Sequence, residues 1–159
     1  MSDIYTFKRI TSLEKLYRKE IEMEINAYHY TAGPLGTKWL ESLREGVLKA
    51  AKCSRCGIIF IPPKIYCPKC FSEAHDLVDI NSEGYIESYT IIYKDNHGRR
   101  LEKPEVIALI RFPGVFGGLI HRVSIDPEEI KMGIKVKPLF RKERRGSITD
   151  IEVFVKAEY

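Results

Sequence analysis

Four cysteines in two close pairs carry the clearest chemical signal in the sequence. Both pairs have the spacing C-x-x-C, and their members are Cys53, Cys56, Cys67 and Cys70. Two such turns can place four thiolates tetrahedrally around one ion at about 2.3 Å. Gly57 follows the first pair and permits the positive φ that these turns often need. The spacing predicts one structural Zn²⁺ ion, and a rubredoxin-like iron centre is the alternative because soft thiolates also select iron.

This metal is expected to be structural, because four thiolates close the coordination sphere and leave no position for a reactive water. Free thiols or disulfides are the other interpretation. All four cysteines lie within eighteen residues, however, and no signal-peptide pattern precedes them, so a reducing, cytoplasmic location is the simpler inference. His75 is a fifth nearby donor, but it is better explained as a surface histidine.

The rest of the sequence offers little catalytic chemistry. His29, His75, His97 and His121 are scattered, and no nucleophile elbow, Walker loop or dinucleotide-binding glycine motif occurs. His121 stands beside Arg122 on an expected strand, where a histidine is more often a packing or surface residue than a general base. The cysteines are used for metal. The sequence therefore favours a binding or scaffolding role without catalysis.

Composition sets broad limits on the protein. The chain has 159 residues, 44% hydrophobic and 30% charged, which is an ordinary globular balance. No run approaches the roughly 20 apolar residues of a membrane helix, so no membrane association is expected. A net charge of +4 is too small to indicate nucleic acid. Residues 131–145 nevertheless hold seven Lys and Arg against the single acid Glu143, either as an anion site or as a solvated strand face.

The first part of the chain, residues 1–46, is expected to form N-terminal helices. A capping box at 11–14 predicts a helix over 12–24. Residues 33–36 read Gly-Pro-Leu-Gly, which predicts a break. A second helix, capped by Thr37 and ended by Gly46, then presents Trp39, Leu40 and Leu43 on one side.

The remainder is expected to be mainly β. A strand over 47–52 enters the zinc ribbon of residues 47–79, and a turn-like junction places a domain boundary near residue 80. Later strands are expected at 85–93, 106–112, 117–124, 136–142 and 151–156, with hairpins at 113–118 and 144–147. In the last strand, alternation places Ile151, Val153 and Val155 on one side and Glu152, Phe154 and Lys156 on the other. These strands predict a five-stranded OB-fold barrel over 80–159, with an SH3-like barrel as the alternative.

These motifs, taken in order, resemble the DUF35 family of acyl-CoA-associated proteins with a zinc ribbon and an OB-fold. The resemblance runs from about residue 36 to residue 154. It is carried by the two cysteine pairs, Phe60-Ile61-Pro62-Pro63 between them, Gly84-Tyr85-Ile86-Glu87-Ser88-Tyr89-Thr90, Gly133-Ile134-Lys135-Val136 and Arg145-Gly146-Ser147-Ile148.

The resemblance implies N-terminal helices, a rubredoxin-like zinc ribbon and a C-terminal OB-fold. Such proteins resemble non-catalytic partners of thiolase-type enzymes. Archaeal members of the family associate with acetoacetyl-CoA thiolase and HMG-CoA synthase of the mevalonate pathway, where they hold the two enzymes together and help to accommodate coenzyme A (CoA). We therefore expect a scaffold that partners thiolase-family enzymes and binds acyl-CoA.

An acyl-CoA scaffold needs cations for phosphates, an apolar channel for the pantetheine arm and an apolar surface for its partner. Arg141 and Arg144 are the candidates for the phosphates, because Arg can grip phosphate oxygens with two parallel hydrogen bonds. The channel candidates are Phe112, Phe140 and also Phe116. Trp39, Leu40 and Leu43 are the candidates for the partner interface, although Trp39 could instead fill the groove between helix and barrel.

The alternative function is a single-stranded nucleic-acid-binding module. OB-folds often bind strands through a basic groove with stacked aromatic rings. Tyr85, Tyr89, Tyr93 and Arg111 could form such a face. The small net charge makes this less favoured.

Overall fold

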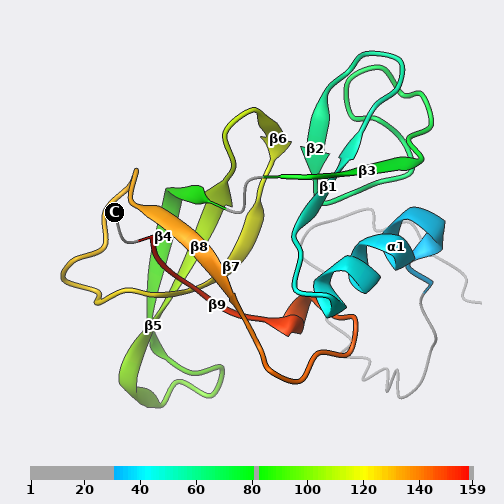
Figure 1. Ribbon diagram of the computed structural model, residues 1–159. Coiled ribbons are helices and arrows are strands. Elements are labelled where there is room, and N and C mark those ends of the chain that lie inside the picture. Colours follow the sequence, from blue (N-terminus) through cyan, green and yellow to red (C-terminus); the bar gives the residue numbers. More distant parts are fainter. Residues whose placement is uncertain (1–30, 81–82, 158–159) are drawn as a thin grey trace, which may run out of the picture. The chain divides into compact units, whose positions relative to one another are not determined.

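The computed structural model describes residues 31–80 and 83–157, which form helix α1 (Gly33–Arg44) and two β-sheets (Figure 1). The helix expected over 12–24 lies outside the described residues. Among the described residues, no helix has the length and apolar character that crossing a membrane requires.

Helix α1 begins earlier than its sequence indicates. Pro34 lies in its first turn, where a missing N–H costs nothing, so the expected break at 33–36 is wrong. Thr37 does not cap the helix, because its hydroxyl donates to the carbonyl oxygen of Gly33 at 2.8 Å. The expected stop signal at Gly46 is confirmed, because the helix ends at Arg44 and Gly46 directly follows the C-cap Glu45. Gly46 has φ of 80° and donates its N–H to the Leu43 carbonyl at 2.9 Å.

The ribbon sheet contains β1 (Lys49–Lys52), β2 (Ile59–Ile61), β3 (Asp76–Asp79) and β6 (Val115–Gly117), in the order β3-β1-β2-β6. Strand β6 comes from the segment 113–118, which was expected to be only a hairpin turn, and it pairs parallel to β2. Glycine makes this pairing possible, since a Cβ on Gly117 would collide with the carbonyl oxygen of Ile61. Gly118 donates its N–H to the same oxygen at 3.1 Å. The ribbon and the barrel are therefore joined through backbone hydrogen bonds.

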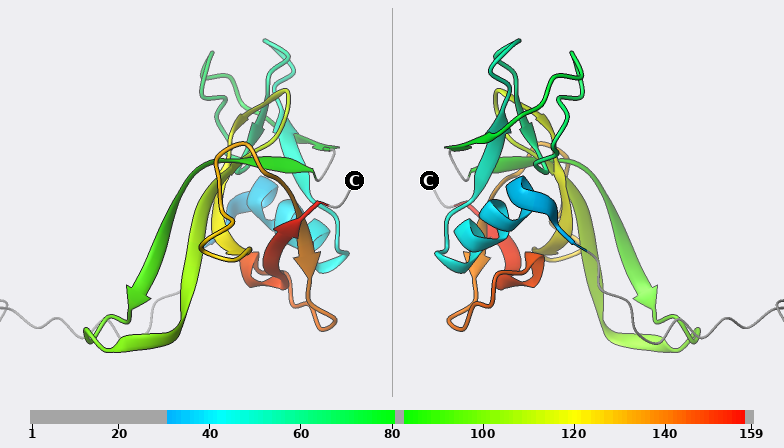
Figure 2. Two further views of the ribbon diagram at one scale, coloured as in Figure 1. Left: turned by 90° about the vertical axis from the view of Figure 1, so that its left-hand side faces the viewer. Right: turned by 90° about the vertical axis from the view of Figure 1, so that its right-hand side faces the viewer.

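The second sheet is a closed barrel of β4 (Gly84–Lys94), β5 (Arg100–Arg111), β7 (Leu119–Ser124), β8 (Lys135–Phe140) and β9 (Ile151–Lys156). The strands follow one another around the barrel as β4-β5-β7-β9-β8. This Greek-key order is that of an OB-fold, which confirms the expected barrel. The hairpin of β4 and β5 extends beyond the other barrel strands (Figure 2).

One cluster of buried side chains joins helix α1 to the barrel, and it includes Leu43, Ile86, Ile110 and Phe154. Ile151 and Phe154 were expected to point to opposite sides of the last strand, and that expectation is wrong, because both are buried. In the pairing of β8 with β9, Leu139 lies opposite Val153 while Phe140 lies opposite Ile151. The extra residue is a bulge that shifts the alternation, so that Ile151 and Phe154 both face inward.

The connection from β8 to β9 is longer than the tight hairpin expected at 144–147. It contains the short 3-10 helix η2 (Ile148–Asp150), which Ser147 and Asp150 cap. Asp150 is buried, and its carboxylate accepts the N–H groups of Arg145, Gly146 and Ser147 at 2.7–3.1 Å. Burial works to raise the pKa of Asp150, but these donors and the nearby Arg144 charge outweigh it and hold the pKa below its ordinary value.

We predict that Asp150→Asn lowers the free energy of unfolding at pH 7 by about 1–3 kcal/mol, because the amide replaces charged hydrogen bonds with weaker ones. A group with a depressed folded-state pKa stabilises the protein above its unfolded pKa, about 3.9, and loses that effect as pH falls through the folded pKa. The difference between the two proteins should therefore be full at pH 6 and shrink below about pH 4. Urea unfolding at a series of pH values measures it.

Asp79→Asn is the matched control. Asp79 is exposed and lies 3.4 Å from Lys49 Nζ, so its removal should cost less than about 1 kcal/mol. Equal effects of the two substitutions at every pH would contradict the role given to Asp150.

Candidate functional site

The four cysteines lie together as their spacing predicts. Their Sγ atoms are all within 4.8 Å of one another, and no disulfide joins them. The Cys53–Cys70 and Cys56–Cys67 sulfur pairs are each 3.5 Å apart. A tetrahedron of thiolates about 2.3 Å from one ion has edges of about 3.8 Å. The group therefore fits a structural zinc ion with four protein ligands.

Two equivalent backbone turns aim the thiols inward. Gly57 donates its N–H to the Cys53 carbonyl at 2.9 Å, and Phe71 donates to the Cys67 carbonyl at 3.0 Å. Both residues have left-handed backbones, with φ of 74° at Gly57 and 56° at Phe71. The second turn therefore places a phenylalanine where the first has a glycine.

Ser72 is a neighbour of the metal site that the motif did not reveal. Its hydroxyl oxygen lies 3.2 Å from Cys53 Sγ and 3.1 Å from Cys70 Sγ. These hydrogen bonds lower the pKa of both thiols, that of Cys53 to about 5. At Cys53 and Cys70 the lowered pKa favours the thiolate form that a metal requires, whereas at Cys56 the Ile58 N–H is outweighed by burial and the neighbouring thiols, which raise the pKa to about 12. His75 is exposed and contacts Glu73 at 3.4 Å, outside the four-sulfur group.

The residues expected at the partner interface belong largely to the core. Trp39 is only 8% exposed, Leu43 is fully buried, and both belong to the cluster that joins α1 to the barrel. Trp39 Nε1 donates to the Lys49 carbonyl at 2.8 Å. Leu40 is half-buried. Trp39 and Leu43 therefore have a packing role, and their side chains offer a partner almost no surface.

The two arginines predicted to bind phosphate differ in their surroundings. Arg144 donates from Nε to the Arg44 carbonyl at 2.7 Å and from a terminal nitrogen to the Arg141 carbonyl at 2.8 Å. It therefore fastens the loop to the C-terminal end of α1. Among the hydrogen bonds of the described residues, the guanidinium of Arg141 donates only from Nε, to the Thr149 carbonyl at 2.9 Å. Arg141 is the better placed of the two for an anion.

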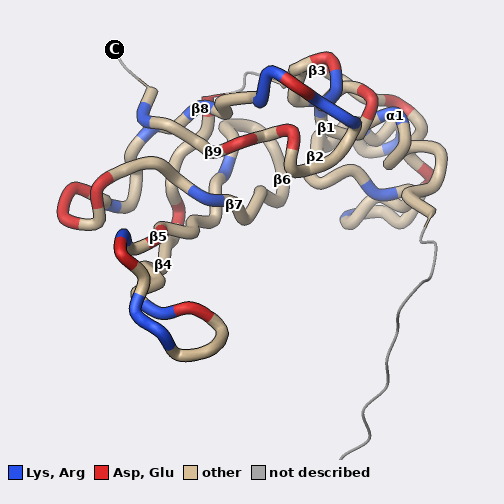
Figure 3. Tube along the Cα trace, turned by 90° about the horizontal axis from the view of Figure 1, so that it is seen from below, with Lys and Arg blue, Asp and Glu red and all other residues tan. Residues whose placement is uncertain are grey.

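Arg141 lines three hollows of the described barrel surface, and two of them adjoin each other at Thr149 as well. One has a volume of about 670 Å³ and a charged lining of both signs, which includes Lys142 and Arg145 but also Glu143, Asp150 and Glu152. The other, of about 310 Å³, has three isoleucines, Ile107, Ile120 and Ile151, in its lining together with His121, Arg122 and Thr149. Lys and Arg dominate the loop between β8 and β9 (Figure 3). Charged lining residues of one hollow and apolar lining residues of the other thus meet at the side chain of Arg141.

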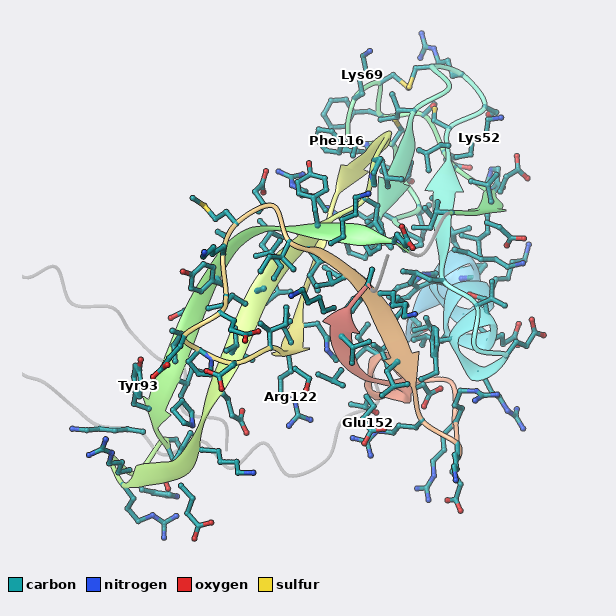
Figure 4. The ribbon with its side chains drawn as sticks, turned by 60° about the vertical axis from the view of Figure 1, so that its left-hand side comes forward. Lys52, Lys69, Tyr93, Phe116, Arg122 and Glu152 are labelled. Carbon is teal, nitrogen blue, oxygen red and sulfur yellow. The ribbon has the colours of Figure 1, made fainter. Side chains whose placement is uncertain are left out.

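The phenylalanines predicted to bind pantetheine are not brought together with Arg141. Phe112 is buried and lines a separate hollow of about 410 Å³ with Tyr85 and Phe116, between the ribbon and the barrel. Phe140 is half-buried against the core. In Figure 4, Phe116 lies beside the ribbon, whereas Arg122 lies under the barrel sheet.

His121 has the environment of a packing residue. It is half-buried, its ring stands edge-on to Phe154 with 5.5 Å between centroids, and burial lowers its pKa. Its Nδ1 lies 3.4 Å from the Arg122 carbonyl oxygen. Its polar contact is thus to the backbone, and not to a nucleophile that it could activate.

A four-cysteine ribbon joined to a Greek-key barrel defines the class of zinc-ribbon OB-fold proteins. Two family models match the chain in that order: the ChsH2 rubredoxin-like zinc ribbon domain over residues 40–76, and the ChsH2 C-terminal OB-fold domain over residues 77–141. The chain belongs to the DUF35 family, as its curated relatives and similar solved structures also show.

Two of these relatives are called DUF35 domain-containing scaffold proteins. That of Methanothermobacter thermautotrophicus is 30% identical over 61% of this chain and 74% of its own length. That of Pyrococcus furiosus is 29% identical over 67% of this chain and 77% of its own length.

Two solved structures are similar. A DUF35 protein of unknown function from Sulfolobus solfataricus has a TM-score of 0.61 and 42% identity over 67% of this chain and 78% of its own. A chain of the Ltp2-ChsH2(DUF35) aldolase has a TM-score of 0.59 and 26% identity over 75% of this chain and 91% of its own.

We predict one zinc ion per chain and a colourless protein, measured by elemental analysis and absorbance. Cys70→Ser should unfold the ribbon, since structural zinc supplies apparent binding free energy on the order of 10 kcal/mol to such units. The barrel strands, which have their own core, should remain folded.

His75→Ala is the control for the metal site and should keep a full equivalent of zinc. Iron in place of zinc, or zinc well below one equivalent in protein prepared without chelators, would refute the assignment.

Proposed function

We propose that this protein is a non-catalytic scaffold that partners thiolase-family enzymes, in particular acetoacetyl-CoA thiolase and HMG-CoA synthase, and helps to hold their acyl-CoA. The observation that carries the proposal is that the chain belongs to the DUF35 family. Curated relatives are named scaffold proteins, and a similar chain forms part of the Ltp2-ChsH2(DUF35) aldolase. The choice of these two enzymes comes from the resemblance in sequence.

The chemistry of the described side chains supports a role without catalysis. The four cysteines form a metal site whose coordination the thiolates would complete, so the metal would hold the fold and not a substrate. His121 contacts a backbone carbonyl oxygen and an aromatic ring. Acyl transfer needs a nucleophile beside a base, and the reaction would then fall to the partner enzyme.

The hollows at Arg141 support the acyl-CoA part of the proposal. CoA combines three phosphate groups with a long pantetheine arm. Arg141, Lys142 and Arg145 bring positive charge to the first hollow, which Glu143 and Glu152 also line, while the Asp150 carboxylate there is engaged by backbone N–H groups. The adjoining hollow offers Ile107, Ile120 and Ile151 to the arm. We assign the phosphates to the first and the arm to the second, in place of Phe112 and Phe140.

Binding of single-stranded nucleic acid is less well supported. Arg111, the cation of the proposed binding face, is held by Glu87 at 2.7 Å and donates to the Gly117 carbonyl at 2.9 Å. Its charge is therefore already paired. Tyr89 and Tyr93 are about half exposed on β4. Affinity for an oligonucleotide that falls steeply with salt would favour this alternative.

We predict that the tagged protein, co-expressed with acetoacetyl-CoA thiolase and HMG-CoA synthase of its own source organism, forms a complex that survives size-exclusion chromatography. Alone, it should show no thiolase or synthase turnover with acetyl-CoA or acetoacetyl-CoA. Separate elution from both enzymes, or turnover by the isolated chain that His121→Ala abolishes, would overturn the proposal.

We predict that Arg141→Gln weakens CoA binding to this complex about tenfold or more, since a hydrogen bond to a charged group contributes about 1.5–3 kcal/mol. Calorimetric titration with CoA measures the change. The control is Lys131→Gln, an exposed cation in the loop before β8, which should leave the affinity unchanged. Equal affinity of Arg141→Gln and the parent would remove Arg141 from the site.

A further inference from the structure

The second cysteine turn presents apolar side chains to solvent. Phe71 is 78% exposed, and Tyr66 and Ile65 of the same loop are also exposed. Lys64 and Lys69 lie between and beside them in the chain and are exposed as well. We call these five residues, Lys64, Ile65, Tyr66, Lys69 and Phe71, the knuckle surface.

Phe71 has an unfavourable backbone conformation, and its side chain adds little packing to the fold. Its φ of 56° is in the left-handed region, where a Cβ is disfavoured and glycine is at ease. The equivalent position of the first turn is Gly57, with φ of 74° and the same hydrogen bond to the first cysteine of its pair. A glycine at position 71 would keep the turn. Most of the Phe71 ring contacts no other part of the described chain, so packing within that part does not account for a phenylalanine at this position.

The charged side chains around this surface are positive. Between Gly46 and Ser72 the chain has no Asp or Glu but five cations, namely Lys49, Lys52, Arg55, Lys64 and Lys69. Lys49 pairs with Asp79, while the next acid, Glu73, pairs with His75. Four thiolates with one Zn²⁺ would carry a charge of −2, which the remaining cations outnumber. A partner that covers this surface should therefore be acidic.

We propose that the knuckle surface docks the partner enzyme, with the Phe71 ring inserted into an apolar pocket that has an acidic rim. This rests on the proposed scaffold function. Aromatic side chains on rigid backbone are the usual anchors of protein interfaces, and complementary charge steers association. Two copies of the chain are not expected to meet through their knuckle surfaces, because both surfaces are basic.

The test is Phe71→Gly in the complex with whichever of the two enzymes co-elutes with the parent protein. Association should weaken at least about tenfold, as for an aromatic anchor. The melting temperature of the isolated chain should stay equal or rise by a few degrees, because the strained backbone is relieved. Loss of a residue with only a structural role would not weaken association while it left the melting temperature equal or higher. Lys64→Glu with Lys69→Glu should also weaken association, and more strongly at low salt.

Met132→Ser is the matched control, since Met132 is another apolar side chain that is 71% exposed, in the loop before β8. Met132→Ser should change neither the affinity for the enzyme nor the melting temperature. Phe71→Gly with parental affinity for the enzyme would overturn the docking site and leave the scaffold function standing. Parent protein that binds neither enzyme overturns both. A sharply lowered melting temperature of Phe71→Gly, or loss of affinity for oligothymidylate in place of the enzyme, would also overturn the docking site.

Discussion

The ribbon depends on its four thiolates, because its own core is too small to hold it. Only a few buried side chains other than cysteine lie around the cluster, chiefly Phe60, Leu35, Ala51 and Ala74. Units of this size usually need a metal or disulfides to fold. Metal coordination also requires the two tight turns and their left-handed residues. The left-handed position that Phe71 occupies at the surface is therefore a consequence of the metal site.

The ribbon and the barrel are joined by backbone pairing. Strand β6 leaves the barrel, pairs with β2, and returns through Gly117 and Gly118. Hydrogen bonds between backbones fix orientation more firmly than contacts between side chains, since few torsions remain free. Arg144 adds a second tie, from the last barrel loop to the end of α1. A scaffold gains from such rigidity, because surfaces on its two domains then keep a constant geometry for their partners.

The β8–β9 loop shows how one buried charge can organise a surface. Asp150 gathers the backbone N–H groups of Arg145, Gly146 and Ser147, and Arg144 turns toward α1. Arg141 is the arginine of this loop that lines both hollows. In a run of similar basic residues, the hydrogen bonds that each one already makes decide which of them can bind a ligand.

The sequence by itself determined the metal ligands, the end of α1 at Gly46 and the five barrel strands. Those features follow from local spacing, periodicity and turn chemistry. Only the tertiary structure decided which strand β6 pairs with, and that Trp39 and Phe154 are buried. It also decided that Arg144 is hydrogen-bonded to α1 while Arg141 lines the hollows. Each depends on segments far apart in the chain: a bulge between β8 and β9, or a carbonyl supplied by another element. Periodicity within one segment carries no information about them, because side-chain burial is set by what packs against the segment.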